Sequence, residues 1–227
     1  MNAQNKNIIA IDGPAASGKG TLARALAEKL NFAYLDTGAL YRATAFEVLN
    51  AGLSVKDDND ARDGAQILVK KIENAGDPNE ILGNATLRED KIGQEASVIA
   101  AYPRVREVLN DLQRNFAKNP GKSFSGAILD GRDIGTVICP DAPLKFYITA
   151  ETEIRAERRL KELQSKGLAV TYEAVLDDMR ERDARDAGRN AAPMKPANDA
   201  IVIDSSHLDA GKMLEKALGF AKERLNL

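Results

Sequence analysis

The sequence has 227 residues, which is enough to bury a full hydrophobic core in one large or two small domains. Its 32 basic and 34 acidic residues nearly balance, so the composition offers no general attraction to nucleic acid or to an anionic membrane. The single cysteine, Cys139, cannot form an intrachain disulfide. No segment resembles a signal peptide or a membrane span, and the first residues lead directly into a strand, so we expect a soluble, cytoplasmic protein.

The first predicted element is a strand at residues 8–11, an apolar run rich in isoleucine. A glycine-rich turn follows, and then leucines recur at helical spacing. Between Gly13 and Lys19 the spacing is that of a P-loop, G-x-x-x-x-G-K, which cradles phosphates with backbone N–H groups and a helix N-terminus. The position after Lys19 departs from this pattern, because Gly20 stands there and the hydroxyl comes one place later, at Thr21. The alternative is a glycine-rich turn with an incidental lysine.

A second anion site is indicated just beyond the second predicted strand, residues 32–35. This strand ends in Asp36-Thr37-Gly38, and a helix is expected from about residue 39, with Thr37 as its cap. Arg42 lies about one turn downstream, so the Thr37 hydroxyl, the helix N-terminus and Arg42 together suit an anion. The alternative for Arg42 is a solvated helix face.

Residues 67–73 and 80–87 are interpreted as two short strands around the turn at 76–79. They predict a small antiparallel meander, inserted between the strand–helix units of the chain. Residues 92–118 predict a helix that is interrupted near Pro103.

A third strand is expected at residues 127–129, and it ends in Asp130-Gly131-Arg132-Asp133. A carboxylate at the carboxyl end of a parallel strand is where P-loop proteins hold Mg²⁺ or its waters, so Asp130 is a candidate metal residue. Arg132 and Asp133 either pair with each other or face a ligand.

Eleven of the sixteen arginines lie between Arg104 and Arg189. A fourth strand is expected at 144–149. The charged helix after it carries Arg155, Arg158 and Arg159 on one face. The next helix, at 172–187, forms a second such face together with Arg189 just beyond it. A neutral chain that gathers bidentate cations in this way is equipped for phosphates, although two salt-bridged solvated helices are the alternative. That second face consists of Arg182, Arg185, Asp186 and Arg189.

A fifth strand at 200–203 and a last helix, capped by Ser205 or Ser206, complete the chain. Five apolar strands that alternate with helices predict an α/β fold. We expect an αβα three-layer arrangement with a five-stranded parallel sheet and ligands at the carboxyl edge.

Five blocks of the sequence resemble the bacterial cytidylate kinases, which are P-loop nucleoside monophosphate kinases. They cover nearly the whole chain in the family's order and spacing, and Asp-Gly-Arg-Asp-x-Gly-Thr-Val is the most specific of them. The Gly-Lys-Gly-Thr run at 18–21 also occurs often among such kinases. The blocks are residues 13–21, 35–42, 101–106, 130–137 and 182–186.

The resemblance implies a single kinase domain with three parts. A core comprises residues 1–36, 108–150 and 168–227, and a monophosphate-binding lobe with the inserted meander comprises 37–107. A short lid comprises 151–167. The implied reaction transfers the γ-phosphate of ATP to CMP or dCMP with Mg²⁺ as the cofactor, and we expect a monomer.

Two alternatives remain. One is a kinase for another monophosphate, UMP or AMP, and the other is a non-catalytic P-loop switch. Guanine-binding switches carry Asn-Lys-x-Asp, which this sequence lacks.

The resemblance also implies roles for individual residues. Asp130 would orient Mg²⁺ through water, and Asp186 would contact the sugar. The catalytic set comprises Lys19, Arg132, Arg155, Arg158 and Arg159. The ATP-binding set comprises Gly13, Pro14, Ala15, Ala16, Ser17, Gly18, Lys19, Gly20 and Thr21. The acceptor phosphate would be held by Thr37, Arg42, Arg132, Arg182 and Arg189, and the base by Ser97, Arg106 and Asp133.

Overall fold

The structure is a computed structural model that describes residues 7–227. The prediction that the first residues lead directly into a strand concerns residues 1–6, which lie outside this range. Within the described range, five strands form one parallel sheet in the order β2-β3-β1-β4-β5. Every predicted strand of the sheet is present to within two residues. The strands are β1 (Ile8–Asp12), β2 (Ala33–Asp36), β3 (Ala127–Gly131), β4 (Leu144–Thr149) and β5 (Ile201–Asp204).

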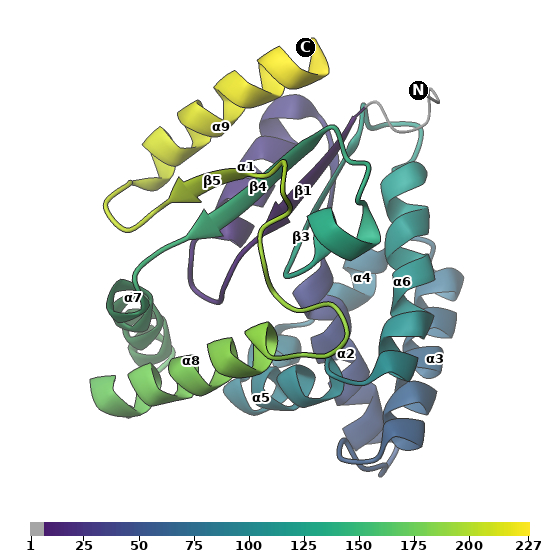
Figure 1. Cartoon of the computed structure of the whole chain (residues 1–227). Coiled ribbons are helices and arrows are strands. Elements are labelled where there is room, and N and C mark those ends of the chain that lie inside the picture. The colour runs from purple at the N-terminus through teal and green to yellow at the C-terminus, as the bar shows by residue number, and fades with distance from the viewer. Residues whose placement is uncertain (1–6) are drawn as a thin grey trace.

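Helices cover the two faces of the sheet, which confirms the αβα prediction (Figure 1). On one face, Ile9 and Ile11 pack with α1 (Lys19–Leu30) and α9 (Ala210–Leu225). On the other, Ile8 and Ala10 belong to the core formed with α2 (Thr37–Asn50), α3 (Asp58–Ala75) and α6 (Pro103–Lys118). Because β1 is buried on both faces, its sequence is a continuous apolar run rather than an alternating one.

The predicted antiparallel meander at residues 67–87 is wrong. The segment belongs to α3, α4 (Pro78–Leu82) and the 3₁₀ turn η2 (Ala85–Arg88). Asp57 caps α3 by accepting from the N–H groups of Asn59 and Asp60. The buried positions 61, 65, 68 and 72 then recur at helical spacing. The helix packs so closely on α2 that a Cβ at Gly64 would lie 2.3 Å from the Val48 side chain.

The chain breaks between α5 (Asp90–Ile99) and α6, which begins at Pro103, as predicted. Near the carboxyl edge of the sheet, α7 (Thr152–Ser165) and α8 (Tyr172–Ala187) pack as a hairpin around Ala156, Leu163, Val175 and Met179 (Figure 1). The short π-helical segment η3 (Ile134–Ile138) follows β3. No helix in residues 7–227 is long and apolar enough to span a membrane.

The predicted cap of the last helix is wrong, because the cap of α9 is Asp209, whose carboxylate accepts from the Lys212 N–H. Ser205 instead donates to the Ser17 carbonyl in the P-loop, and Ser206 donates to the Asp204 carboxylate. Both hydroxyls therefore make hydrogen bonds in or beside the segment that follows β5, and neither caps α9.

Candidate active site

The predicted strand, loop and helix of the P-loop are present in that order. A Cβ at Gly13 would lie 2.0 Å from the Ile148 carbonyl oxygen, so only glycine allows β1 and β4 to stay this close as the chain turns. Gly18, with φ of 87°, is the N-cap of α1 and supplies no side-chain cap. The N–H groups at the start of α1 therefore point toward an open cleft, as an anion site requires.

This cleft has a volume of about 570 Å³, and it extends from the P-loop to α5 and α8. Its volume lies in the range of small-molecule sites. All the residues predicted to bind the acceptor line it, as do Asp130, Arg158 and Arg159. Three of the predicted ATP-binding residues, Gly13, Pro14 and Ser17, are not among its lining residues.

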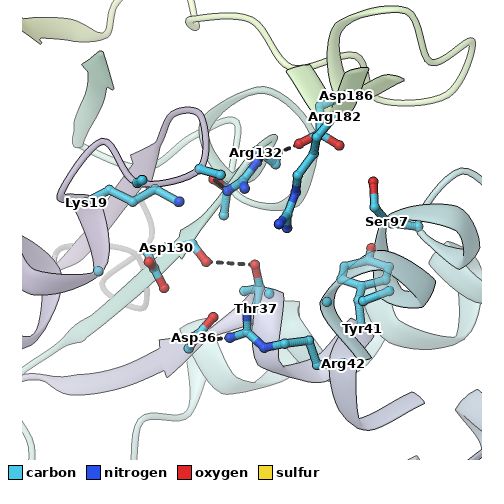
Figure 2. A pocket seen from close by; sticks show the side chains of 18 of the residues that line it. Lys19, Asp36, Thr37, Tyr41, Arg42, Ser97, Asp130, Arg132, Arg182 and Asp186 are labelled. Carbon is cyan, nitrogen blue, oxygen red and sulfur yellow. Dashed lines mark hydrogen bonds and ion pairs between the residues drawn. The ribbon is translucent and has the colours of Figure 1, made fainter. Parts of the chain in front are cut away.

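Lys19 is the cation at the P-loop end of the cleft (Figure 2). Its Nζ donates to the Pro14 carbonyl at 3.2 Å. Burial, together with the Arg132 cation, lowers the pKa of Lys19, while Asp130 and Asp36 oppose that shift. A polyphosphate in the cleft would favour the charged form of the lysine.

Asp130 lies at the end of β3 and is 4% exposed. Its Oδ1 accepts from the Tyr34 hydroxyl at 3.1 Å. Burial and the neighbouring Asp36 raise the pKa of Asp130. A Cβ at Gly20 would lie 3.2 Å from its Oδ2, so the glycine that departs from the P-loop pattern leaves room for this carboxylate.

Asp130 fits a role beside a hydrated magnesium ion, because it offers carboxylate oxygens in a cleft that is lined by the P-loop and several arginines, and Thr21 also lines this cleft. Within residues 7–227 there is no cluster of three or more His, Cys, Asp or Glu residues that could hold a metal on its own. An ion there would therefore take most of its ligands from water and from the nucleotide, which is how Mg²⁺ is usually held in kinases.

Thr37 and Arg42 lie at the start of α2, but Thr37 is not the cap. Asp36 caps the helix by accepting from the Ala39 N–H at 2.9 Å, and its other oxygen binds Arg42 at 2.8 Å. The Thr37 hydroxyl donates to the Asp130 carbonyl at 2.7 Å, which ties α2 to β3 (Figure 2). Asp36 was not among the predicted site residues, although its position at a strand end resembles that of Asp130.

The three predicted base-binding residues are buried together. Arg106 donates to the Asp133 carboxylate, and the two side chains are 4% and 8% exposed. The Arg106 guanidinium also lies over the ring of Tyr41, 5.8 Å from its centroid. The Ser97 hydroxyl is buried and has no hydrogen-bond partner among the described residues. An unsatisfied hydroxyl in a ligand-sized cleft indicates a place for a polar ligand atom.

Asp133 therefore pairs with Arg106, and the predicted alternative of an Arg132–Asp133 pair is not formed. Arg132 instead donates from Nε to Asp186 at 2.9 Å, and Arg189 donates to the other oxygen of Asp186. Burial raises the pKa of Asp186, but Arg132, Arg189 and Arg182 outweigh burial and hold that pKa below its usual range.

Arg182 points into the middle of the cleft (Figure 2). Burial and the neighbouring Arg132 lower the pKa of Arg182 to about 10. No acidic side chain in residues 7–227 lies within ion-pair distance of it, and its Nε has no hydrogen-bond partner in that range. A cation kept beside other cations, without a carboxylate of its own, suits an anionic ligand.

The three arginines of α7 have different environments. Arg155 is 3% exposed, donates to the carbonyls of Ala150 and Ala15, pairs with Asp183 at 2.6 Å, and does not line the cleft. Its shared helical face with Arg158 and Arg159 therefore does not bring it into the site. Arg158 donates to the Ser205 carbonyl at 2.6 Å, and Arg159 pairs with Asp90 at 2.6 Å.

Three contacts join α5 directly to the α7–α8 hairpin across the cleft, one of which is made by Arg185, which donates to Gln94 at 3.3 Å. Arg159 reaches Asp90, and Gln94 donates to Asp178. Neither Asp90 nor Gln94 was predicted as a site residue, since a polar residue on a helix carries no local signal for a contact across a cleft.

The comparisons with known proteins agree with this geometry. The family model described as "Cytidylate kinase" matches residues 9–223. A protein named cytidylate kinase from Rhodospirillum rubrum is 54% identical over 93% of this chain and 95% of its own length. Another of that name from Paramagnetospirillum magneticum is 53% identical over 93% of this chain and 96% of its own length.

Among solved structures, an uncharacterized protein from Eubacterium ventriosum aligns with a TM-score of 0.53 and 17% identity, over 96% of this chain and 99% of that one. At that identity the likeness concerns the fold alone. The family match covers almost the whole chain and includes every residue that lines the cleft, so this chain belongs to the cytidylate kinase family.

Proposed function

We propose that this chain transfers the γ-phosphate of ATP to CMP or dCMP, which yields ADP and CDP or dCDP. The observation that carries the proposal is that one cleft joins a P-loop to Arg182, a partly buried cation without a carboxylate partner among the described residues, and to the buried Arg106–Asp133 pair. A donor phosphate chain and an acceptor nucleotide thus have separate places in a shared space.

The donor side of the proposal uses residues 13–21. The N–H groups of the loop and of the first turn of α1 bind the β- and γ-phosphates, and Lys19 follows the charge as the γ-phosphoryl group moves. Mg²⁺ supplied with ATP neutralises part of the charge on these phosphates when it is bound. Asp130 would hold water molecules of that ion, and Thr21 lies in the same part of the cleft.

The acceptor side uses side chains from separate elements. Arg42, Arg132, Arg182 and Arg189 would bind the acceptor phosphate, with Thr37 at the helix start, and thereby align its oxygen with the γ-phosphate. Asp186, held between Arg132 and Arg189, would accept from a sugar hydroxyl.

The base is selected by hydrogen-bond type. The exocyclic amino group of cytosine donates hydrogen bonds, and the Asp133 carboxylate can accept from it. Arg106 and Ser97 can donate to the acceptors of the ring. Uracil has a carbonyl at the same position, which would leave the carboxylate without a donor.

Closure would use the lid helix α7, which packs against α8. Arg158 and Arg159 line the cleft, so they would stabilise the transferring phosphoryl group and exclude water. Arg155 would hold α7 in place through its contacts with the Ala15 carbonyl and with Asp183 of α8. The proposal retains the division into a core (1–36, 108–150 and 168–227), a monophosphate-binding lobe (37–107) and a lid (151–167).

A coupled assay of ADP release with CMP, dCMP, UMP and AMP as acceptors tests the proposal. We expect the highest kcat/KM with CMP or dCMP. A preference for UMP or AMP would assign a different acceptor, and nucleotide binding without turnover would indicate a P-loop switch.

A further inference from the structure

Asp12, the last residue of β1, is a buried carboxylate that none of the roles above uses. It is 3% exposed and does not line the cleft. Its Oδ1 accepts from the Ile134 N–H at 2.8 Å, and its Oδ2 accepts from the Gly135 N–H at 2.7 Å. The strand that leads into the P-loop is thus bonded to the first residues of η3, directly after Asp133.

These bonds act on the backbone of Asp133. The peptide unit between Asp133 and Ile134 is planar, so an acceptor that holds its N–H also restricts ψ of Asp133. The carbonyl of the same unit accepts from the N–H groups of Val137 at 2.9 Å and Ile138 at 3.2 Å. With both ends of the unit held, ψ of Asp133 is restricted, and with it the direction of the bond from its Cα to Cβ; the pair with Arg106 then holds the carboxylate.

A contribution to stability does not account for an ionised carboxylate here. Burial raises the pKa of Asp12 to about 7, although the two backbone N–H groups lower it. A carboxyl whose pKa is higher in the folded state lowers stability as the pH rises from the unfolded value toward 7. In residues 7–227 no basic side chain pairs with Asp12 to offset this.

We propose that Asp12 is a positioning residue that orients Asp133, and so sets the choice of base, from the donor side of the sheet. The inference rests on the proposed function, because base choice has meaning only if the chain phosphorylates a monophosphate.

The test is Asp12→Asn in the full chain, which keeps the shape of the side chain but turns an NH₂ group toward one of the two N–H donors. We expect kcat/KM for CMP to fall about tenfold or more, the scale found for residues that orient metal ligands. The CMP-to-UMP ratio should shrink, while KM for ATP stays within about twofold. A loss shared equally by CMP and UMP would overturn the inference.

The matched control is Asp57→Asn, because Asp57 also accepts from two backbone N–H groups and lies outside the cleft. It should leave all three kinetic quantities unchanged. If the control shrinks the CMP-to-UMP ratio as much as Asp12→Asn does, the effect is not specific to Asp12, and the inference is overturned.

If Asp12→Asn fails to fold, amide hydrogen exchange on the ligand-free wild-type protein tests whether the contact between Asp12 and the N–H groups after Asp133 is held in solution. The N–H groups of Ile134 and Gly135 should exchange far more slowly than those of the exposed loop at 121–123. Fast exchange of both would overturn the inference. Failure of the wild type to phosphorylate CMP would instead overturn the proposed function, and the exchange measurement would remain informative about the contact.

Discussion

At the end of the cleft that we propose holds the donor, the P-loop lining comes from one short stretch, residues 15–21, and includes the backbone at the start of α1. At the end that we propose holds the acceptor, the side chains come from α2, α5, α6, α8 and the segments that directly follow β3 and α8. Several of these are already joined in ion pairs, Arg106 with Asp133 and Arg132 and Arg189 with Asp186.

This difference has consequences for function. Lys19 makes no ion pair within the described residues, so its charge is available to a ligand. Apart from Arg182, the arginines proposed to bind the acceptor are instead held by carboxylates before a ligand arrives, and each of those carboxylates is a possible specificity residue. Changes at the donor end should therefore act mainly on the rate, and changes at the acceptor end on selectivity and stability.

The largest effect is expected for Lys19→Met. Losing one preorganised cation in the transition state should lower kcat about a hundredfold or more. The melting temperature should not fall, because burial and Arg132 already disfavour the charged form of Lys19. Steady-state kinetics and thermal melts measure both quantities, with Lys29→Met in the last turn of α1 as the control. A folded variant with near-normal turnover would remove Lys19 from the mechanism.

The next largest effect is expected for Asp133→Ala. Discrimination between CMP and UMP in the wild type should be roughly 10²-fold or larger, since uracil leaves the carboxylate without a donor. The variant should lose kcat/KM for CMP far more than for UMP, so the ratio shrinks.

Asp199→Ala is the control for this change, because Asp199 pairs with Lys145 outside the cleft. Equal losses for CMP and UMP in Asp133→Ala would mean that the Arg106–Asp133 pair only supports the fold.

A smaller effect is expected when Arg158 and Arg159 are both changed to Gln. Turnover should fall severalfold or more, while the free energy of unfolding changes by at most about 1 kcal/mol, as for exposed or half-exposed pairs. Arg180→Gln is the matched control on the same hairpin, since Arg180 pairs with Glu153 and Asp177 and does not line the cleft. Unchanged turnover in the double variant would assign the two arginines to a solvated helix face.

The smallest effect concerns the pH dependence of stability. The pKa of Asp186 lies below its usual range, so the unfolded chain binds the proton first as the pH falls. The stability that this carboxylate contributes is present above its unfolded pKa and is lost as the pH falls through the folded one. In Asp186→Asn the acid-induced fall in melting temperature should therefore be a few degrees smaller. Melts at pH 7 and at about pH 3.5 measure it, and an identical fall in both proteins would contradict the expectation.

The parts of the molecule that sequence reasoning predicted well are those in which neighbouring residues act together. The P-loop is one such part, because its shape depends on glycines and a helix start within nine consecutive residues. The strands are another, because burial on both faces demands uninterrupted apolar runs. The same reasoning wrongly predicted a strand at residues 67–73, because a short apolar run such as Ile67–Val69 occurs in strands and in buried helices alike. Packing of α3 against α2 decided between them.

Charge pairing at the acceptor end depended on tertiary structure. Arg155, Arg158 and Arg159 share one helical face in sequence, yet the packing of α8 buries Arg155 against Asp183 and leaves the other two at the cleft. Asp133 is adjacent to Arg132 in sequence but pairs with Arg106, from another element. Such pairs form between groups that the fold brings within a few ångströms across long loops. Helical periodicity and sequence spacing carry no information about those distances.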